Sequence, residues 1–220
     1  MTGKMSVGGV VTAIVKQKNN RRRLNIFLDG EFAFSLEPVV AGWLQIGQVL
    51  DEKAVEELKR KDIPESAFEK AMHFMNYRER TSEEIRQKLA GLGFDEQVIE
   101  SVLTRMETSR LVDDERFARL WIESRNNHRP SGSRLLKMEL RRKGIPEPVV
   151  NEAIEQAGDE AELALSAVRS HIHRWAELDK KDFRLKVYRF LVSRGFSYDV
   201  VQDTVEKLWN EIPHADFVEK

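Results

Sequence analysis

The sequence predicts a mainly helical protein: tandem three-helix repeats in an elongated, curved array, preceded by a small β-meander and a helix. Three observations predict this class. The 220 residues include only 12 Gly and 6 Pro, and 33% are charged, which is typical of a helix-rich protein. A glycine motif recurs at a fixed spacing after residue 65, where no strand pattern is found. The first 60 residues instead show the alternation of β-strands.

The amino-terminal segment contains three candidate strands. Residues 10–15 are rich in β-branched side chains, and residues 24–28 and 31–36 alternate between polar and apolar positions. Asp29-Gly30 lies between the second and third strands and is a dipeptide typical of a type I′ hairpin turn. We therefore expect a three-stranded antiparallel meander.

Helical signals follow the meander. Pro38 begins a short helical turn that runs to Trp43, and Asp51 caps a helix whose first turn is acidic. We expect this helix to end at Ile63-Pro64, because the residue before proline is pushed out of the helical region.

The repeat is centred on Gly93, Gly144 and Gly195, which are 51 residues apart. Each glycine ends a helix and is expected to adopt the left-handed conformation, and the apolar residue after it supplies the contact that accompanies such a cap. A new helix with one apolar stripe then begins. A unit of about 50 residues buries only about 60% of its unfolded surface, so neighbouring units should stabilise one another.

We divide the chain into four segments. Residues 1–63 form the β-rich segment with its helix, and the three-helix repeats occupy 64–111, 112–157 and 158–220. In the third repeat the leading helix is expected over roughly 159–178, longer than in the other two.

Composition excludes several kinds of function. No cysteine is present, which removes disulfides, thiolate metal sites and thiol nucleophiles. No apolar run reaches about 18 residues, and the first residues lack the apolar core of a signal peptide, so we expect a cytoplasmic protein without membrane contact. The histidines are isolated or on opposite helix faces, and Asp113-Asp114-Glu115 is best interpreted as an acidic helix start. We therefore expect no metal, no cofactor and no enzymatic activity.

The charge distribution is uneven although the net charge is only −1. Residues 116–143 contain nine bases and only two acids, a local charge of +7. Arg134, Lys137 and Arg141 recur on one helix face, apart from Leu136 and Leu140, where they could neutralise phosphates or face an acidic partner. We predict that the nine bases form a partner- or nucleic-acid-binding surface: Arg116, Arg119, Arg125, Arg129, Arg134, Lys137, Arg141, Arg142 and Lys143.

Three motifs carry a resemblance to a known family. They are Tyr77-Arg-Glu-Arg-Thr-Ser-Glu-Glu-Ile85, Leu111-Val-Asp-Asp-Glu-Arg-Phe-Ala118 and Leu140-Arg-Arg-Lys-Gly-Ile145. Together with the repeat, they resemble the RecX family, bacterial regulators of the RecA recombinase, over residues 65–210; the meander resembles an extra segment of many members. The resemblance implies a non-enzymatic protein of DNA repair, recombination and the SOS response. It would bind in the groove of the RecA–DNA filament and restrain ATP hydrolysis and strand exchange.

Two alternatives to a RecA regulator are a helix-turn-helix DNA-binding protein and an enzyme such as a nuclease. A helix-turn-helix DNA-binding protein should present a recognition helix rich in Arg, Asn or Gln. The helices after the three glycines begin instead with Asp95-Glu96, Pro146-Glu147 and Ser197-Tyr198-Asp199, and the acidic residues would repel phosphates. A nuclease or other enzyme has still less support. The expected partners are the RecA filament and single- or double-stranded DNA, and the expected state is a monomer.

Overall fold

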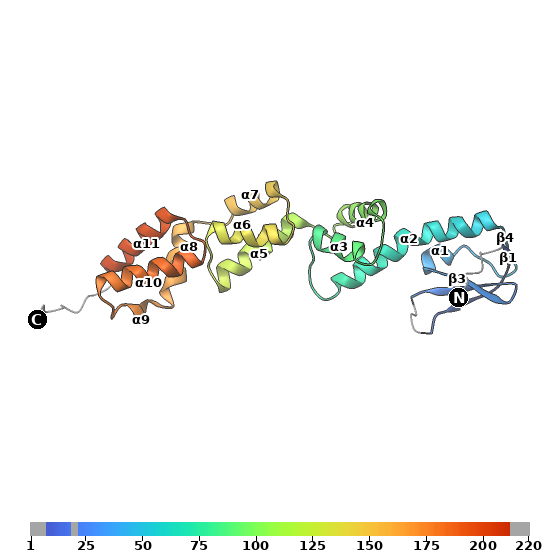
Figure 1. Cartoon of the computed structure of the whole chain (residues 1–220), viewed down its shortest axis with the longest axis horizontal. Coiled ribbons are helices and arrows are strands. Elements are labelled where there is room, and N and C mark those ends of the chain that lie inside the picture. Colours follow the sequence, from blue (N-terminus) through green and yellow to red (C-terminus); the bar gives the residue numbers. More distant parts are fainter. Residues whose placement is uncertain (1–7, 19–21, 212–220) are drawn as a thin grey trace, which may run out of the picture. The chain divides into compact units, whose positions relative to one another are not determined.

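The computed structural model describes residues 8–18 and 22–211 and begins with a small antiparallel sheet (Figure 1). Its strands are β1 (Gly9–Lys16), β2 (Leu24–Leu28), β3 (Glu31–Leu36) and β4 (Val49–Leu50). The predicted three-stranded meander is confirmed, and the two-residue strand β4 extends it on the other side of β1, in the order β3-β2-β1-β4. The remaining described elements are helices.

The hairpin between β2 and β3 turns at Asp29 and Gly30, as predicted. Their φ values are 48° and 85°, so both central residues have the positive φ of a type I′ turn. Helix α1 (Pro38–Ala41) follows β3 and helps to close one face of the sheet. The buried side chains of this part come from the strands, α1 and the following helix: Val11, Ile26, Leu28, Phe34, Leu36, Ala41, Leu50 and Val55.

Helix α2 (Glu52–Met75) is a single helix that contains Pro64, so the predicted helix end at Ile63-Pro64 is wrong. Asp51 caps it as expected, since its Oδ1 accepts a hydrogen bond from the amide of Ala54 at 2.7 Å. A proline inside a helix costs about 3 kcal/mol. Packing on both sides of Pro64 offsets this cost, because Asp62 is held against the sheet and Ala67 is fully buried.

Asp62 ties α2 to the sheet through a buried polar network. Its Oδ1 accepts a hydrogen bond from the amide of Glu37, and its Oδ2 accepts one from Arg23, both at 2.6 Å. Arg23 also donates to Glu37 Oε1 and Ser66 Oγ, each at 3.0 Å. The sequence gives no signal for this contact, because its members are up to 43 residues apart.

The helical repeats follow in chain order. The first repeat uses the end of α2 with α3 (Ser82–Ala90) and α4 (Glu96–Thr108). The second comprises α5 (Asp114–His128), α6 (Ser133–Arg142) and α7 (Glu147–Glu155). The third comprises α8 (Glu160–Arg169), α9 (Ile172–Trp175), α10 (Lys180–Ser193) and α11 (Tyr198–Glu211).

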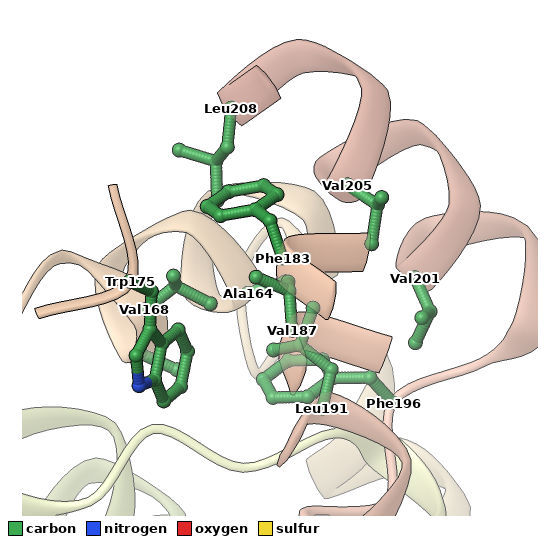
Figure 2. Packing of buried hydrophobic residues seen from close by; sticks show 11 residues of the cluster. Ala164, Val168, Trp175, Phe183, Val187, Leu191, Phe196, Val201, Val205 and Leu208 are labelled. Atoms are coloured by element: carbon green, nitrogen blue, oxygen red, sulfur yellow. The ribbon is translucent and has the colours of Figure 1, made fainter. Parts of the chain in front are cut away.

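The leading helix of the third repeat is split into α8 and α9, so the single helix expected over 159–178 is wrong. The break at Ser170-His171 accompanies the entry of Trp175 into the core, where only 7% of this residue is exposed. Figure 2 shows Trp175 near Val168 and the side chains of α10. Side chains from α8 to α11 fill this core, among them Phe183, Val187, Leu191, Phe196, Val201, Val205 and Leu208.

The three glycine caps are confirmed. Gly93, Gly144 and Gly195 have φ values of 85°, 76° and 80°. In each cap the amide after the glycine donates to the carbonyl five residues earlier, and the glycine amide donates to the carbonyl three residues earlier. This is the Schellman arrangement, which satisfies the last carbonyls of α3, α6 and α10.

The chain separates into two compact units. One unit contains residues 1–79 and 85–111, and the other contains residues 80–84 and 112–220. The predicted elongated, curved array describes how the repeats are arranged relative to one another, and it stays a prediction. The predicted division into four segments also stays a prediction.

Candidate partner-binding surface

The structure places all nine predicted binding residues on the second repeat. Arg116, Arg119 and Arg125 lie on α5, and Arg129 follows it directly. The others lie on α6 or immediately after it: Arg134, Lys137, Arg141, Arg142 and Lys143. The local charge of this repeat is therefore concentrated on two helices and their ends.

Arg119, Arg125, Arg141 and Lys143 are among the cations that form ion pairs. Arg119 lies 4.0 Å from Glu115 and Arg125 lies 2.7 Å from Glu139. Two further pairs join Arg141 to Glu147 at 2.6 Å and Lys143 to Glu84 at 2.8 Å. These pairs reduce the positive charge that the repeat can offer to a partner.

Arg125 and Lys143 take part in a cluster around Trp121. The indole Nε1 of Trp121 donates to Glu139 Oε2 at 2.8 Å, and Arg125 Nε donates to the same oxygen at 2.7 Å. The guanidinium of Arg125 lies 4.7 Å from the ring centre and the Lys143 ammonium lies 5.4 Å from it. Trp121 also stacks on Phe117. The cluster joins α5 to α6, so these two cations serve the fold of the repeat.

The predicted stripe of Arg134, Lys137 and Arg141 is only partly open. Leu136 and Leu140 are buried on a different face, as the helix period predicts. Lys137 Nζ donates to Asn151 Oδ1 at 3.1 Å, and Arg141 forms two hydrogen bonds with Glu147. These bonds from Arg141 lower the pKa of the Glu147 carboxyl. Of the stripe, Arg134 is exposed and has no carboxylate partner among the described residues, Lys137 keeps its charge although Asn151 holds its ammonium group, and the charge of Arg141 is balanced by Glu147.

Three exposed cations of the second repeat have no carboxylate partner among residues 8–18 and 22–211: Arg129, Arg134 and Arg142. Arg134 and Arg142 lie at the two ends of α6, about 12 Å apart along its axis. Arg129 precedes Pro130 in the loop before α6. Burial lowers the pKa of Arg194, and the nearby charge of Arg129 lowers it further. These three residues are the strongest candidates for contact with an anionic surface.

The helix starts expected to oppose DNA binding are acidic. Helix α7 begins at Glu147, which pairs with Arg141, and α4 begins at Glu96, which pairs with Arg86.

Within the part of the chain that the structure describes, no three His, Asp or Glu side chains are placed to hold a metal ion. No helix of that part is both long and apolar enough to cross a bilayer.

The fold and this surface define a class: a protein in which a small sheet is followed by three helical repeats, with a basic stretch over residues 116–143 of the second repeat. Comparison with known proteins identifies the family. The sequence matches the RecX family models over residues 9–51 (Regulatory protein RecX N-terminal domain), 67–106 (first three-helix domain), 113–154 (second) and 158–205 (third). The chain belongs to the RecX family of regulatory proteins.

Curated relatives and solved structures agree with this assignment. Regulatory protein RecX of Bacillus licheniformis is 30% identical over 201 residues, covering 90% of this chain and 76% of the relative. Regulatory protein RecX of Clostridium perfringens is 29% identical and covers 92% and 97%. A crystal structure of regulatory protein RecX matches with a TM-score of 0.72 at 27% identity, covering 91% of this chain and all of that one. A RecX structure from Lactobacillus salivarius shares the fold, with a TM-score of 0.63 at 22% identity over 68% of this chain.

Proposed function

We propose that this chain is a non-enzymatic, cytoplasmic regulator that binds the filament of RecA recombinase on DNA and modulates its ATP hydrolysis and strand exchange. Membership of a family of regulatory proteins supports the regulatory role. The single observation that carries the proposal of a filament contact is the set of exposed, unpaired cations on the second repeat.

These cations suit a filament because such a filament presents DNA phosphates and acidic protein side chains. Arg129, Arg134 and Arg142 are exposed, and arginine binds phosphate or carboxylate through a planar fork of donors. Contacts with phosphate release bound counterions, so the affinity should fall as salt concentration rises.

The test is co-sedimentation with RecA filaments assembled on single-stranded DNA, together with the rate of ATP hydrolysis. The triple variant Arg129→Glu, Arg134→Glu, Arg142→Glu should lose most salt-sensitive binding. Its thermal stability should change little, because surface substitutions usually cost less than about 0.5 kcal/mol. The matched control is Lys53→Glu, Arg60→Glu, Lys207→Glu, which changes the same charge at exposed sites elsewhere.

Two outcomes would contradict the proposal. If the wild-type protein neither sediments with the filaments nor changes ATP hydrolysis, the chain does not regulate RecA in this way. If the two triple variants lose binding equally, bulk charge governs binding and the second repeat is not the contact.

A further inference from the structure

A groove of about 690 Å³ lies in the amino-terminal unit. One wall is formed by Lys70, His73, Phe74 and Tyr77 at the end of α2, and the other by Lys88 and Leu92 at the end of α3. All of its lining residues belong to one compact unit. Its volume is in the range of ligand-binding clefts.

The walls combine apolar surface with positive charge. Tyr77 is 78% exposed and Leu92 is 46% exposed, while Phe74 is half-buried. The Lys88 ammonium lies 5.8 Å from the ring centre of Phe74. Neither Lys70 nor Lys88 has a carboxylate partner among the described residues. The groove therefore favours a ligand that carries both an apolar group and carboxylates.

The two arginines that line the groove are paired with carboxylates. Arg22 pairs with Glu69 at 3.1 Å, and Arg23 pairs with Glu37 at 3.0 Å. The unpaired charge of the groove therefore comes from the two lysines, of which Lys88 lies in α3 shortly before its glycine cap.

The internal repeat shows what occupies the equivalent place in the rest of the chain. Leu92-Gly93 corresponds to Lys143-Gly144 and to Arg194-Gly195 at the 51-residue spacing. Thr81 Oγ1 donates to the carbonyl of Lys143 at 2.7 Å. The amide of Gly132, 51 residues after Thr81, donates to the carbonyl of Arg194 at 2.9 Å. In both cases the first turn of a helix sits on the cap of a later helix.

The space around the glycines agrees with this correspondence. A Cβ added at Gly144 would lie 2.3 Å from Glu83, and one added at Gly195 would lie 2.5 Å from the amide nitrogen of Leu135. A Cβ added at Gly93 would meet no described atom within 4 Å. Among the three caps, the cap of α3 is the one on which no helix start is seated in the described part of the chain.

We propose that the groove and the adjoining α3 cap bind the first turn of an acidic helix from a partner protein. The model for this contact is the cap of α6, where Lys143 pairs with Glu84 of the seated helix start at 2.8 Å. At the α3 cap, Lys70 and Lys88 would receive the carboxylates, and Tyr77 and Leu92 would contact an apolar side chain.

A second copy of this chain is a poor candidate for the occupant. Its helix starts at 81–84 and 132–135 are already seated on the caps of α6 and α10, and the corresponding start of α10 carries Lys180 and Lys181, which would be repelled by the lysines of the groove. A nucleic acid is less favoured, because helix starts fill the two equivalent caps and because both groove arginines are paired. The partner, taken from the proposed function, is the recombinase, so the inference depends on that proposal.

The test uses the full chain with Lys70→Glu, Lys88→Glu and measures co-sedimentation with RecA filaments on single-stranded DNA. The matched control is Lys53→Glu, Arg60→Glu, which makes the same charge change at exposed sites near the start of the same helix. The groove variant should bind about tenfold more weakly, and the control should stay within about twofold of the wild type. Tyr77→Phe should keep the affinity and Tyr77→Ala should lower it. Thermal unfolding verifies that each variant folds.

The outcomes separate the two proposals. If the wild type does not bind filaments, both the proposed function and this docking site are overturned. If the wild type binds and the groove variant binds equally well, only the docking site is overturned. If the groove variant loses binding to a bare single-stranded oligonucleotide to the same extent, the groove takes nucleic acid and the acidic-helix proposal is wrong.

Discussion

The contact between the second and third repeats can be tested at Gly195, where two separate constraints meet. Its φ of 80° strains any residue with a side chain, at about 1–2 kcal/mol. In addition, a Cβ there would lie 2.5 Å from the amide nitrogen and 2.6 Å from the Cβ of Leu135, and such overpacking costs about 1–3 kcal/mol. Alanine also restricts the unfolded chain, which returns about 0.4–1 kcal/mol. Gly195→Ala should therefore lower the free energy of unfolding by about 3 kcal/mol.

Gly158 supplies the control in the same unit. Its φ is 96°, but a Cβ there would meet no described atom within 4 Å, so Gly158→Ala should cost only about 1 kcal/mol. Urea unfolding followed by tryptophan fluorescence measures both, since Trp175 lies in the core beside the Gly195 cap. The melting temperatures should fall by about 6–12 °C and about 2–4 °C. Equal losses in the two variants would refute the close approach of Leu135 to the cap.

Two further predictions concern carboxylates that accept hydrogen bonds within the fold. Burial raises the pKa of Glu37. Just above the ordinary pKa of a glutamate, the folded state therefore binds more protons at this group than the unfolded state does. The contribution of Glu37 to the free energy of unfolding falls as the pH rises through this range. Glu37→Gln should flatten this slope just above the ordinary pKa of a glutamate, and an unchanged slope in urea unfolding would contradict the assignment. Glu160 Oε1 accepts hydrogen bonds from the amides of Ser133 and Ser197 at 3.0 and 3.4 Å. Glu160→Ala should cost about 2 kcal/mol and speed amide exchange at the starts of α6 and α11, whereas unchanged exchange would count against this shared cap.

The features predicted correctly from the sequence are those that depend on neighbouring residues. A helix cap needs a glycine with the next apolar residue, and a type I′ turn needs Asp29-Gly30, so the pattern and its physical cause lie within a few positions. The start of α3 depends on neighbouring residues in the same way, because Thr81 Oγ1 accepts a hydrogen bond from the amide of Glu84 at 3.2 Å.

The features predicted wrongly depend on distant contacts. Proline at 64 disfavours a helix locally, but the contacts of Asp62 with the sheet and the burial of Ala67 hold α2 together across it. Strand β4 has only two residues, which are too few to show an alternating pattern. It is a strand because it pairs with β1. The split between α8 and α9 likewise accompanies the burial of Trp175, which no local pattern encodes.

The same distinction applies to the candidate site. The charge pattern of the sequence identifies the basic stretch 116–143, but it does not show which of its cations are paired. Arg141 and Glu147 are six residues apart across a cap, whereas Lys143 and Glu84 are 59 residues apart. The sequence does not single out Lys70 and Lys88, because they lie on two different helices and only the fold brings them to one groove.

The spacing of 51 residues indicates equivalent contacts between repeats even where the residue types at the equivalent positions differ. Thr81 uses a hydroxyl and Gly132 uses a backbone amide, yet both donate to the carbonyl just before a cap glycine. Asp114 and Glu160, each the first residue of the next leading helix, accept hydrogen bonds from the first amides of α3 and α6, those of Ser82 and Ser133. The geometry is therefore repeated while the chemistry varies, so a search for identical residues would miss it. By the same logic, the α3 cap should accept a helix start of different sequence, provided that it brings an orphan donor to the Leu92 carbonyl and carboxylates to the two lysines.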